Sequence, residues 1–171
     1  MFSPSSKATE DVVPWFEPKG DLNLWKQMVN LYDAPGNEVR AFVLFMSFGA
    51  PLYNFLNIGS MTVHLTNKAS GVGKSTAQMV AASVWGDPKY LLMLATDTDN
   101  AKYQQFGVLR HLPLFIDEIT NMPPDRLSDF AFRVSQNRGK HRMTSHSNSL
   151  RKNTSFWETM VITSGNNSLY E

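Results

Sequence analysis

Short apolar runs alternate with longer segments of helical periodicity along most of this chain. Four of the runs, Met61–Leu65, Leu91–Ala95, Leu112–Glu118 and Thr159–Thr163, have the length and composition of buried strands. Between them, apolar residues recur at three- and four-residue spacings, as at Leu127, Phe130, Ala131 and Val134. Strands that alternate with helices predict an α/β fold, a three-layer core with a mainly parallel sheet and helices on both faces.

The chain before the first strand is predicted to be helical. Asp21 is positioned to cap a helix that runs to about Tyr32, and a second helix over about Glu38–Phe48 is apolar on nearly every side, which predicts burial on most sides. A short helix follows around Leu52–Leu56. We therefore expect an irregular lead-in over residues 1–20, a helical segment over 21–58 packed on the core, and the core itself over 59–171.

Aromatic residues are concentrated in this helical segment. Their helical spacing favours packing in the core, although a platform for a nucleobase is the alternative interpretation. The residues concerned are Trp25, Phe42, Phe45, Phe48, Tyr53 and Phe55.

Composition adds few constraints to this picture. A chain of 171 residues suits one domain, its lack of cysteine excludes disulfides and thiolate metal sites, and its net charge of +1 excludes a uniformly basic protein. The N-terminus lacks the apolar core of a secretion signal. The run Ala41–Leu56 is interrupted by polar residues and is shorter than the roughly 20 residues of a membrane span, so no membrane is expected.

The segment Asn67–Thr76, with the sequence NKASGVGKST, has the features of a phosphate-binding loop. A strand precedes it and the predicted helix Ser75–Trp85 follows, so backbone N–H groups and the helix dipole would point at one phosphate. Lys74 would contact the β- and γ-phosphates of ATP, and the Ser75 hydroxyl would bind Mg²⁺. The expected nucleotide-binding residues are Ala69, Ser70, Gly71, Val72, Gly73, Lys74, Ser75 and Thr76.

One position departs from the usual loop pattern GxxxxGK[ST]. Lys68 stands where the first glycine is expected, while Gly71 and Gly73 still provide two positions without side chains. The alternative interpretation is an ordinary loop that contains the letters GKS by chance.

A second motif follows the third predicted strand. Asp117 and Glu118 end that strand at the edge where ligands collect in open α/β sheets, and they would hold Mg²⁺ and polarise the attacking water, respectively. Asn166 ends the last strand and could hydrogen-bond the γ-phosphate and the water, with Asn167 as the competing position. The alternatives are exposed carboxylates at a strand end and a turn rich in Ser, Gly and Asn.

Basic residues are concentrated between the last predicted helix and the last strand. No acidic residue occurs from Arg133 to Asn153, and Ser, Thr and Asn between the cations could also contact phosphates. Such a segment can follow a single strand of DNA without reading its bases, although a solvated loop has the same composition. The predicted DNA contacts are Arg138, Lys140 and Arg142.

In order, SGVGKST, LFIDEI, RGKHR and WETMVITSGN resemble the motifs of superfamily 3 and related phage-type primase-helicase ATPases of the AAA+ class of P-loop NTPases. The resemblance implies ATP on the loop, Mg²⁺ on Ser75 and Asp117, and catalysis by Lys74 and Glu118 with Asn166 as the sensor. It also implies a hexameric ring around DNA and, for a phage-encoded protein, the cytoplasm of a bacterial host. The chain ends just after the sensor strand, where the family continues, so we expect a truncated core.

These features predict the nucleotide-binding core of a DNA-replication helicase that couples ATP hydrolysis to movement along single-stranded DNA in a complete protein. We expect the core alone not to unwind DNA. A P-loop kinase of small molecules and a non-catalytic nucleotide-binding assembly module are the alternative functions.

Overall fold

The computed structural model describes residues 7–56, 58–139, 142–143, 150–151 and 155–169. Its centre is a four-stranded sheet in the order β1-β6-β3-β2, in which every neighbouring pair is parallel. The strands are β1 (Met61–Thr66), β2 (Leu92–Leu94), β3 (Leu114–Asp117) and β6 (Met160–Gly165). The predicted parallel α/β sheet is confirmed, and β6 separates the phosphate-loop strand β1 from the acidic strand β3.

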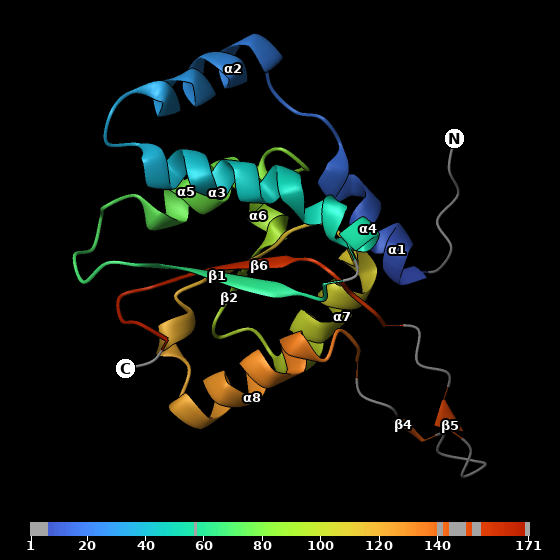
Figure 1. Ribbon diagram of the computed structural model, residues 1–171. Helices are drawn as coiled ribbons and strands as arrows, with labels where there is room; N and C mark the ends of the chain where they lie inside the picture. The colour runs from blue at the N-terminus through green and yellow to red at the C-terminus, as the bar shows by residue number, and fades with distance from the viewer. Residues whose placement is uncertain (1–6, 57, 140–141, 144–149, 152–154, 170–171) are drawn as a thin grey trace.

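Helices cover both faces of this sheet, as a parallel sheet requires. Figure 1 shows α3 and α5 above the sheet and α7 and α8 below it. These helices are α3 (Glu38–Gly49), α5 (Lys74–Ala82), α7 (Asp99–Leu109) and α8 (Pro124–Ser135). Because all strands run the same way, their carboxyl ends meet at one edge, where the loop between β1 and α5 also lies (Figure 1).

The lower face is held by an aromatic cluster. The Phe106 ring packs edge-on against Trp157 with the ring centroids 5.3 Å apart, and Phe130 and Tyr103 stack beside them. Phe106 and Trp157 are at most 1% exposed. Aromatic pairs of this kind add to the hydrophobic effect of their burial and fix α7 and α8 on the sheet.

The N-terminal lead-in is more ordered than expected. Instead of an irregular segment, the described part forms α1 (Lys7–Val12) and the 3₁₀ turn η1 (Val13–Phe16), and Trp15 packs against the core. Its carbonyl accepts a 2.7 Å hydrogen bond from the Asp87 N–H, and a Cβ added to Gly86 would lie 2.3 Å from that carbonyl oxygen. Gly86 therefore permits this close packing, and its φ is not positive.

Asp21 caps the next helix as predicted. Its carboxylate accepts a 2.8 Å hydrogen bond from the Leu24 N–H at the start of α2 (Leu22–Asn30), which ends in the 3₁₀ turn η2 (Leu31–Asp33). After α3, the helical path continues through η3 (Ala50–Leu52) and α4 (Tyr53–Leu56).

The expected burial of this helical segment is wrong for one side of it. In α3, only Val43, Leu44 and Ser47 are buried. The Ser47 hydroxyl donates to the Ala81 carbonyl of α5. The outward side is apolar and exposed. Its large exposed side chains are Val39, Phe42, Phe45, Phe48, Leu52, Phe55 and Leu56. Helical spacing predicted core packing for the aromatic residues of this segment. Of those residues, only Tyr53 is buried.

By length and composition, Glu38–Leu56 could also cross a membrane. Its most apolar window has a mean hydropathy of 1.4, and 28% of that window is buried. A helix of this kind is weak evidence for a membrane span, since helices of soluble proteins can meet the same criteria.

Three short elements complete the connections between the larger ones. Asp87 caps the one-turn helix α6 (Pro88–Leu91), and the 3₁₀ turn η4 (Ile119–Asn121) follows β3. In the basic segment, β4 (Arg142–Met143) pairs antiparallel with β5 (Leu150–Arg151). This pair lies away from the main sheet in Figure 1.

Candidate functional site

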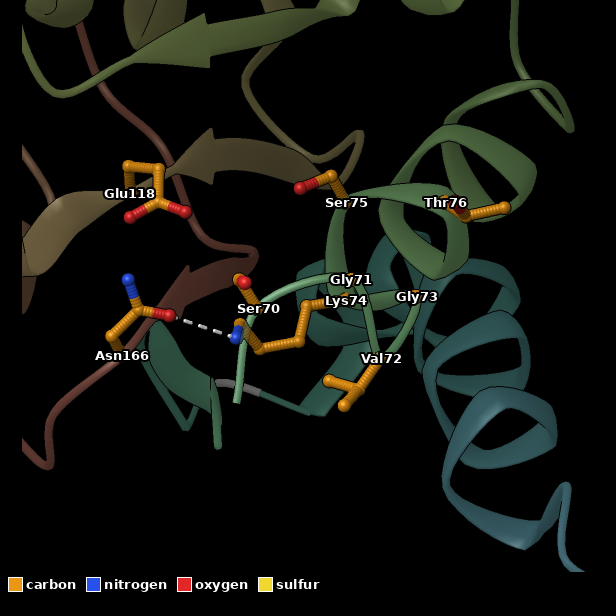
Figure 2. A pocket seen from close by; sticks show the side chains of 9 residues that line it. All are labelled: Ser70, Gly71, Val72, Gly73, Lys74, Ser75, Thr76, Glu118 and Asn166. Atoms are coloured by element: carbon orange, nitrogen blue, oxygen red, sulfur yellow. Dashed lines mark hydrogen bonds between the residues drawn. The ribbon is translucent and has the colours of Figure 1, made fainter. Parts of the chain in front are cut away.

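The loop between β1 and α5 forms one wall of a cleft at the carboxyl edge of the sheet. Gly71 has a φ of 74° and Gly73 a φ of 90°, a left-handed conformation that favours glycine, and a Cβ on Gly71 would meet nothing within 4 Å. The Gly73 conformation directs the chain into α5 at Lys74. The residues that line the cleft are Ser70, Gly71, Val72, Gly73, Lys74, Ser75, Thr76, Glu118 and Asn166 (Figure 2).

The Lys74 ammonium bridges the loop and the end of β6. Its Nζ donates to the Asn67 carbonyl at 3.0 Å, to the Ala69 carbonyl at 3.3 Å and to the Asn166 side-chain oxygen at 3.0 Å (Figure 2). Ala69 therefore contacts the lysine through its backbone and does not line the cleft. All three donor positions of the ammonium therefore meet oxygen atoms of the protein.

The acidic residues Asp117 and Glu118 at the end of β3 have different surroundings, and only Glu118 lines the cleft. Glu118 has a φ of 54°, in the left-handed region that is unusual for residues other than glycine. Its N–H donates to the Asp117 carboxylate at 3.1 Å and to the Ser164 hydroxyl at 3.2 Å, and that hydroxyl also donates closely to Asp117. The turn places Glu118 in the cleft (Figure 2), while β6 holds Asp117 through Ser164.

Asn166, and not Asn167, presents its side chain to the cleft. The Asn166 amide oxygen contacts Lys74, whereas Asn167 is exposed and its carbonyl lies 2.9 Å from the His64 Nε2. The Asn166 N–H donates to the Thr120 hydroxyl at 3.3 Å. A Cβ on the preceding Gly165 would lie 2.5 Å from that hydroxyl oxygen, so glycine is required for η4 to pack this closely on β6.

Four contributors to the site were missed by the sequence reasoning, namely Arg40, Gln78, Thr120 and Ser164. Arg40 comes from α3 and donates to the Val72 carbonyl at 3.0 Å and to the Asn37 side chain at 2.6 Å. All four contact segments that are far away in the sequence, and Gln78 does so through a buried amide in α5. No local motif marks such residues. The sequence gives one signal, which is that Thr120 and Ser164 each lie two residues from a predicted site residue.

The two predicted Mg²⁺ ligands, Ser75 and Asp117, have side-chain oxygens, the kind of ligand that this ion binds. The Ser75 hydroxyl faces the cleft in Figure 2, and Asp117 lies beside Glu118 at the end of β3. Within the described residues, no group of three or more His, Cys, Asp or Glu side chains could hold a metal by itself. Mg²⁺ commonly takes only one or two protein oxygens, with phosphate oxygens and water as the other ligands, so these residues fit that ion.

Of the predicted DNA contacts, the structure describes the side chain of Arg138. Arg138 is exposed and follows α8, while Lys140 and the Arg142 side chain lie outside the described residues. The segment 136–159 connects the end of α8 to the start of β6, and backbone hydrogen bonds such as Gly139 N–H to the Ser155 carbonyl close its base. The basic segment therefore begins and ends at the amino edge, whereas the cleft is at the carboxyl edge.

Comparison with solved structures supports the fold assignment. The chain is similar to the structure described as SCCmec type IV Cch, an active helicase, with a TM-score of 0.69 and 21% sequence identity. The similarity covers 91% of this chain and 29% of that chain. At this identity the likeness shows the fold alone, and the chain spans less than a third of the length of that protein. A comparison with curated proteins finds no match.

Comparison with protein families identifies the chain more directly. Residues 5–155 match the family described as Domain of unknown function (DUF927). The match includes the predicted phosphate loop, the acidic pair and all of the basic stretch from Arg133 to Asn153, and it covers most of the chain. The chain therefore belongs to the DUF927 family.

Proposed function

We propose that this domain binds ATP with Mg²⁺ and hydrolyses it, as the nucleotide-binding core of a DNA-replication helicase from a phage or mobile element. The observation that carries the proposal is the convergence of Lys74, Glu118 and Asn166 on one cleft formed by a glycine-containing loop and a helix N-terminus. The likeness to a structure described as an active helicase supports the helicase context. Assignment to the superfamily 3 and AAA+ ATPases rests on the order of the motifs.

Each residue would have a distinct task in the reaction. Bound MgATP would supply the γ-phosphoryl group and a cation to neutralise its charge. The N–H groups of the loop and of the first turn of α5 would bind phosphate oxygens, and Lys74 would balance negative charge beside them. Glu118 would orient and polarise the water, and the Asn166 amide would hold it near the γ-phosphate.

The proposal extends to the complete protein. There, a ring of six copies around single-stranded DNA would use hydrolysis for movement, and the basic segment with Arg138, Lys140 and Arg142 would contact the DNA backbone. Neighbouring copies would complete each site in such a ring. The described ends of the basic segment lie at the amino edge of the sheet and the cleft lies at the carboxyl edge, which supports this division between a nucleotide site and a DNA site.

Replacement of the loop lysine tests the nucleotide site. We expect Lys74→Ala to weaken binding of MgATP by at least about 100-fold, since the variant loses a charge-assisted contact to phosphate. Isothermal titration calorimetry measures the affinity, and Lys89→Ala, an exposed lysine outside the cleft, is the matched control. Unchanged affinity in the Lys74 variant would contradict the proposal. Binding without hydrolysis, even beside a complete partner protein, would favour the assembly module, and phosphate transfer to a metabolite would favour the kinase.

A further inference from the structure

Gln78 connects the phosphate-loop helix to both strands that carry the other cleft residues. It lies in α5, three residues after Ser75 and four after Lys74, and is completely buried. Helical spacing of three to four residues places Gln78 one turn beyond these two, on the side of α5 that faces the sheet. Its side-chain Nε2 donates to the Ile116 carbonyl of β3 at 3.2 Å and to the Ile162 carbonyl of β6 at 3.0 Å.

The two carbonyls belong to the parts of β3 and β6 that lead directly into the cleft. Ile116 precedes Asp117, and backbone pairing between the strands ends at Ile116 and Thr163. Beyond that point, the strands are joined through the side chains of Ser164 and Asp117. One amide group therefore bonds both strands just before the positions of Glu118 and Asn166.

The chemistry of Gln78 is unusual for a residue that only fills the core. Its Oε1 is buried and has no hydrogen-bond partner among the described residues. A buried polar atom without a partner is unfavourable, and an apolar side chain of similar volume would avoid this cost. The amide is better explained by what its nitrogen does, which is to hold two strands and one helix in a fixed relation.

We propose that Gln78 is a positioning residue that sets the distance between the phosphate loop and the strand ends bearing Glu118 and Asn166. This inference rests on the proposed nucleotide site. Lys74 and the loop can contact phosphates of both ADP and ATP, whereas Glu118 and Asn166 are placed for the γ-phosphate and the water beside it. Gln78 therefore affects recognition of the third phosphate more than binding of the first two.

The test is Gln78→Met, which keeps the length of the side chain and removes both donors. We expect the affinity for ADP to stay within about two-fold of wild type, while the affinity for a non-hydrolysable ATP analogue falls by at least about ten-fold. Gln105→Met is the matched control, because Gln105 donates to the Leu91 carbonyl from α7. Calorimetric titrations give the affinities, and thermal melting shows whether each variant is folded.

Equal losses for the two nucleotides, or no loss for either, would overturn the positioning role. A wild-type protein that binds neither nucleotide would instead overturn the proposed function on which it rests, so the two failures are distinguishable. A purely structural glutamine would lower the melting temperature and both affinities together.

Gln78→Glu provides a second test if the methionine variant does not fold. A protonated carboxyl group can donate to one carbonyl, whereas a carboxylate cannot donate and is repelled by both carbonyls. We therefore expect the affinity of this variant for the ATP analogue, relative to wild type, to rise between about pH 8 and about pH 6 as the carboxyl group gains its proton. A ratio that does not change with pH would overturn the positioning role.

Discussion

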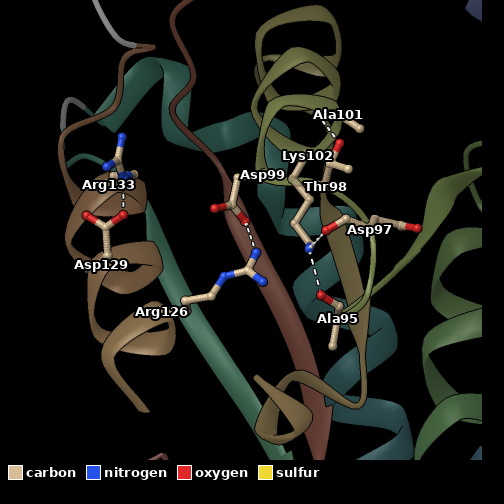
Figure 3. A network of polar contacts seen from close by, with 9 residues as sticks. All are labelled: Ala95, Asp97, Thr98, Asp99, Ala101, Lys102, Arg126, Asp129 and Arg133. Atoms are coloured by element: carbon tan, nitrogen blue, oxygen red, sulfur yellow. Dashed lines mark hydrogen bonds and ion pairs between the residues drawn. The ribbon is translucent and has the colours of Figure 1, made fainter. Parts of the chain in front are cut away.

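At the scale of single residues, the cleft depends on groups whose environments are set by the backbone. Glu118 reaches the cleft from a left-handed conformation, and Gly165 lets Thr120 approach β6. A comparable contact follows the outer strand β2, where Lys102 is only 1% exposed and donates to the Ala95 and Asp97 carbonyls (Figure 3). Single side chains thus fix the loops that leave the strands.

Burial lowers the pKa of Lys102 below its ordinary value of 10.5, although the nearby carboxylates of Asp99 and Asp97 oppose the shift. Between the folded-state pKa and 10.5, the unfolded chain therefore binds more protons than the folded one, and stability rises with pH. We expect the free energy of unfolding of wild type, relative to Lys102→Met, to increase as pH approaches 10.5 from below. Urea unfolding at several pH values measures this difference. A difference that is constant or falls with pH would contradict the assignment.

At the scale of elements, the sequence predicted the strands and helices more reliably than it predicted which of their faces are buried. The apolar runs at Leu112–Glu118 and Thr159–Thr163 became β3 and β6 because alternation of strands and helices leaves few other topologies. The cleft residues from the loop to Asn166 followed from the rule that ligands collect at the carboxyl edge.

Other features depended on contacts that no local pattern encodes. Gly86, for example, is explained by the close approach of the Trp15 backbone, which is far away in the sequence. The apolar composition of α3 led us to expect burial on most sides. Composition does not indicate which side of the helix packs against α5 and which side stays exposed. Arg40 and Gln78 reach the site across 32 residues and at least 38 residues of chain, respectively, and such contacts exist only once the fold has formed.

The basic segment is the element whose function can be tested independently of the cleft. We expect replacement of Lys140 and Arg142 by alanine to weaken binding of single-stranded DNA and to reduce the slope of log affinity against log salt by about 1.4, at roughly 0.7 per lost phosphate contact. Fluorescence anisotropy with labelled oligonucleotides at several salt concentrations gives both quantities.

The control for the DNA experiment is a variant with the same loss of charge elsewhere. Lys7 and Lys26 are exposed and lie in the N-terminal helices, so their joint replacement by alanine tests for a general effect of charge. Equal DNA binding by wild type and the Lys140/Arg142 variant would remove the DNA-contacting role from this segment.

At the scale of the whole molecule, the domain presents two surfaces that usually have partners. Among the described residues, β1 is an edge strand, and an unpaired edge can accept another strand. The outward side of α3, η3 and α4 is apolar, with Phe45 69% and Phe55 80% exposed. Large exposed apolar patches mark association surfaces. The cleft lies elsewhere, and its described lining residues include Lys74, Glu118 and Asn166.

In the proposed function, Lys74, Glu118 and Asn166 surround the phosphates of one nucleotide. The most direct measurement is a crystal structure of the domain with Mg²⁺ and a non-hydrolysable ATP analogue. We expect phosphates on the N–H groups of the loop, Mg²⁺ beside Ser75 and Asp117, and a Lys74 ammonium that has exchanged the Asn67 and Ala69 carbonyls for phosphate oxygens. A nucleotide bound elsewhere, with Lys74 still on those carbonyls, would contradict the proposed function.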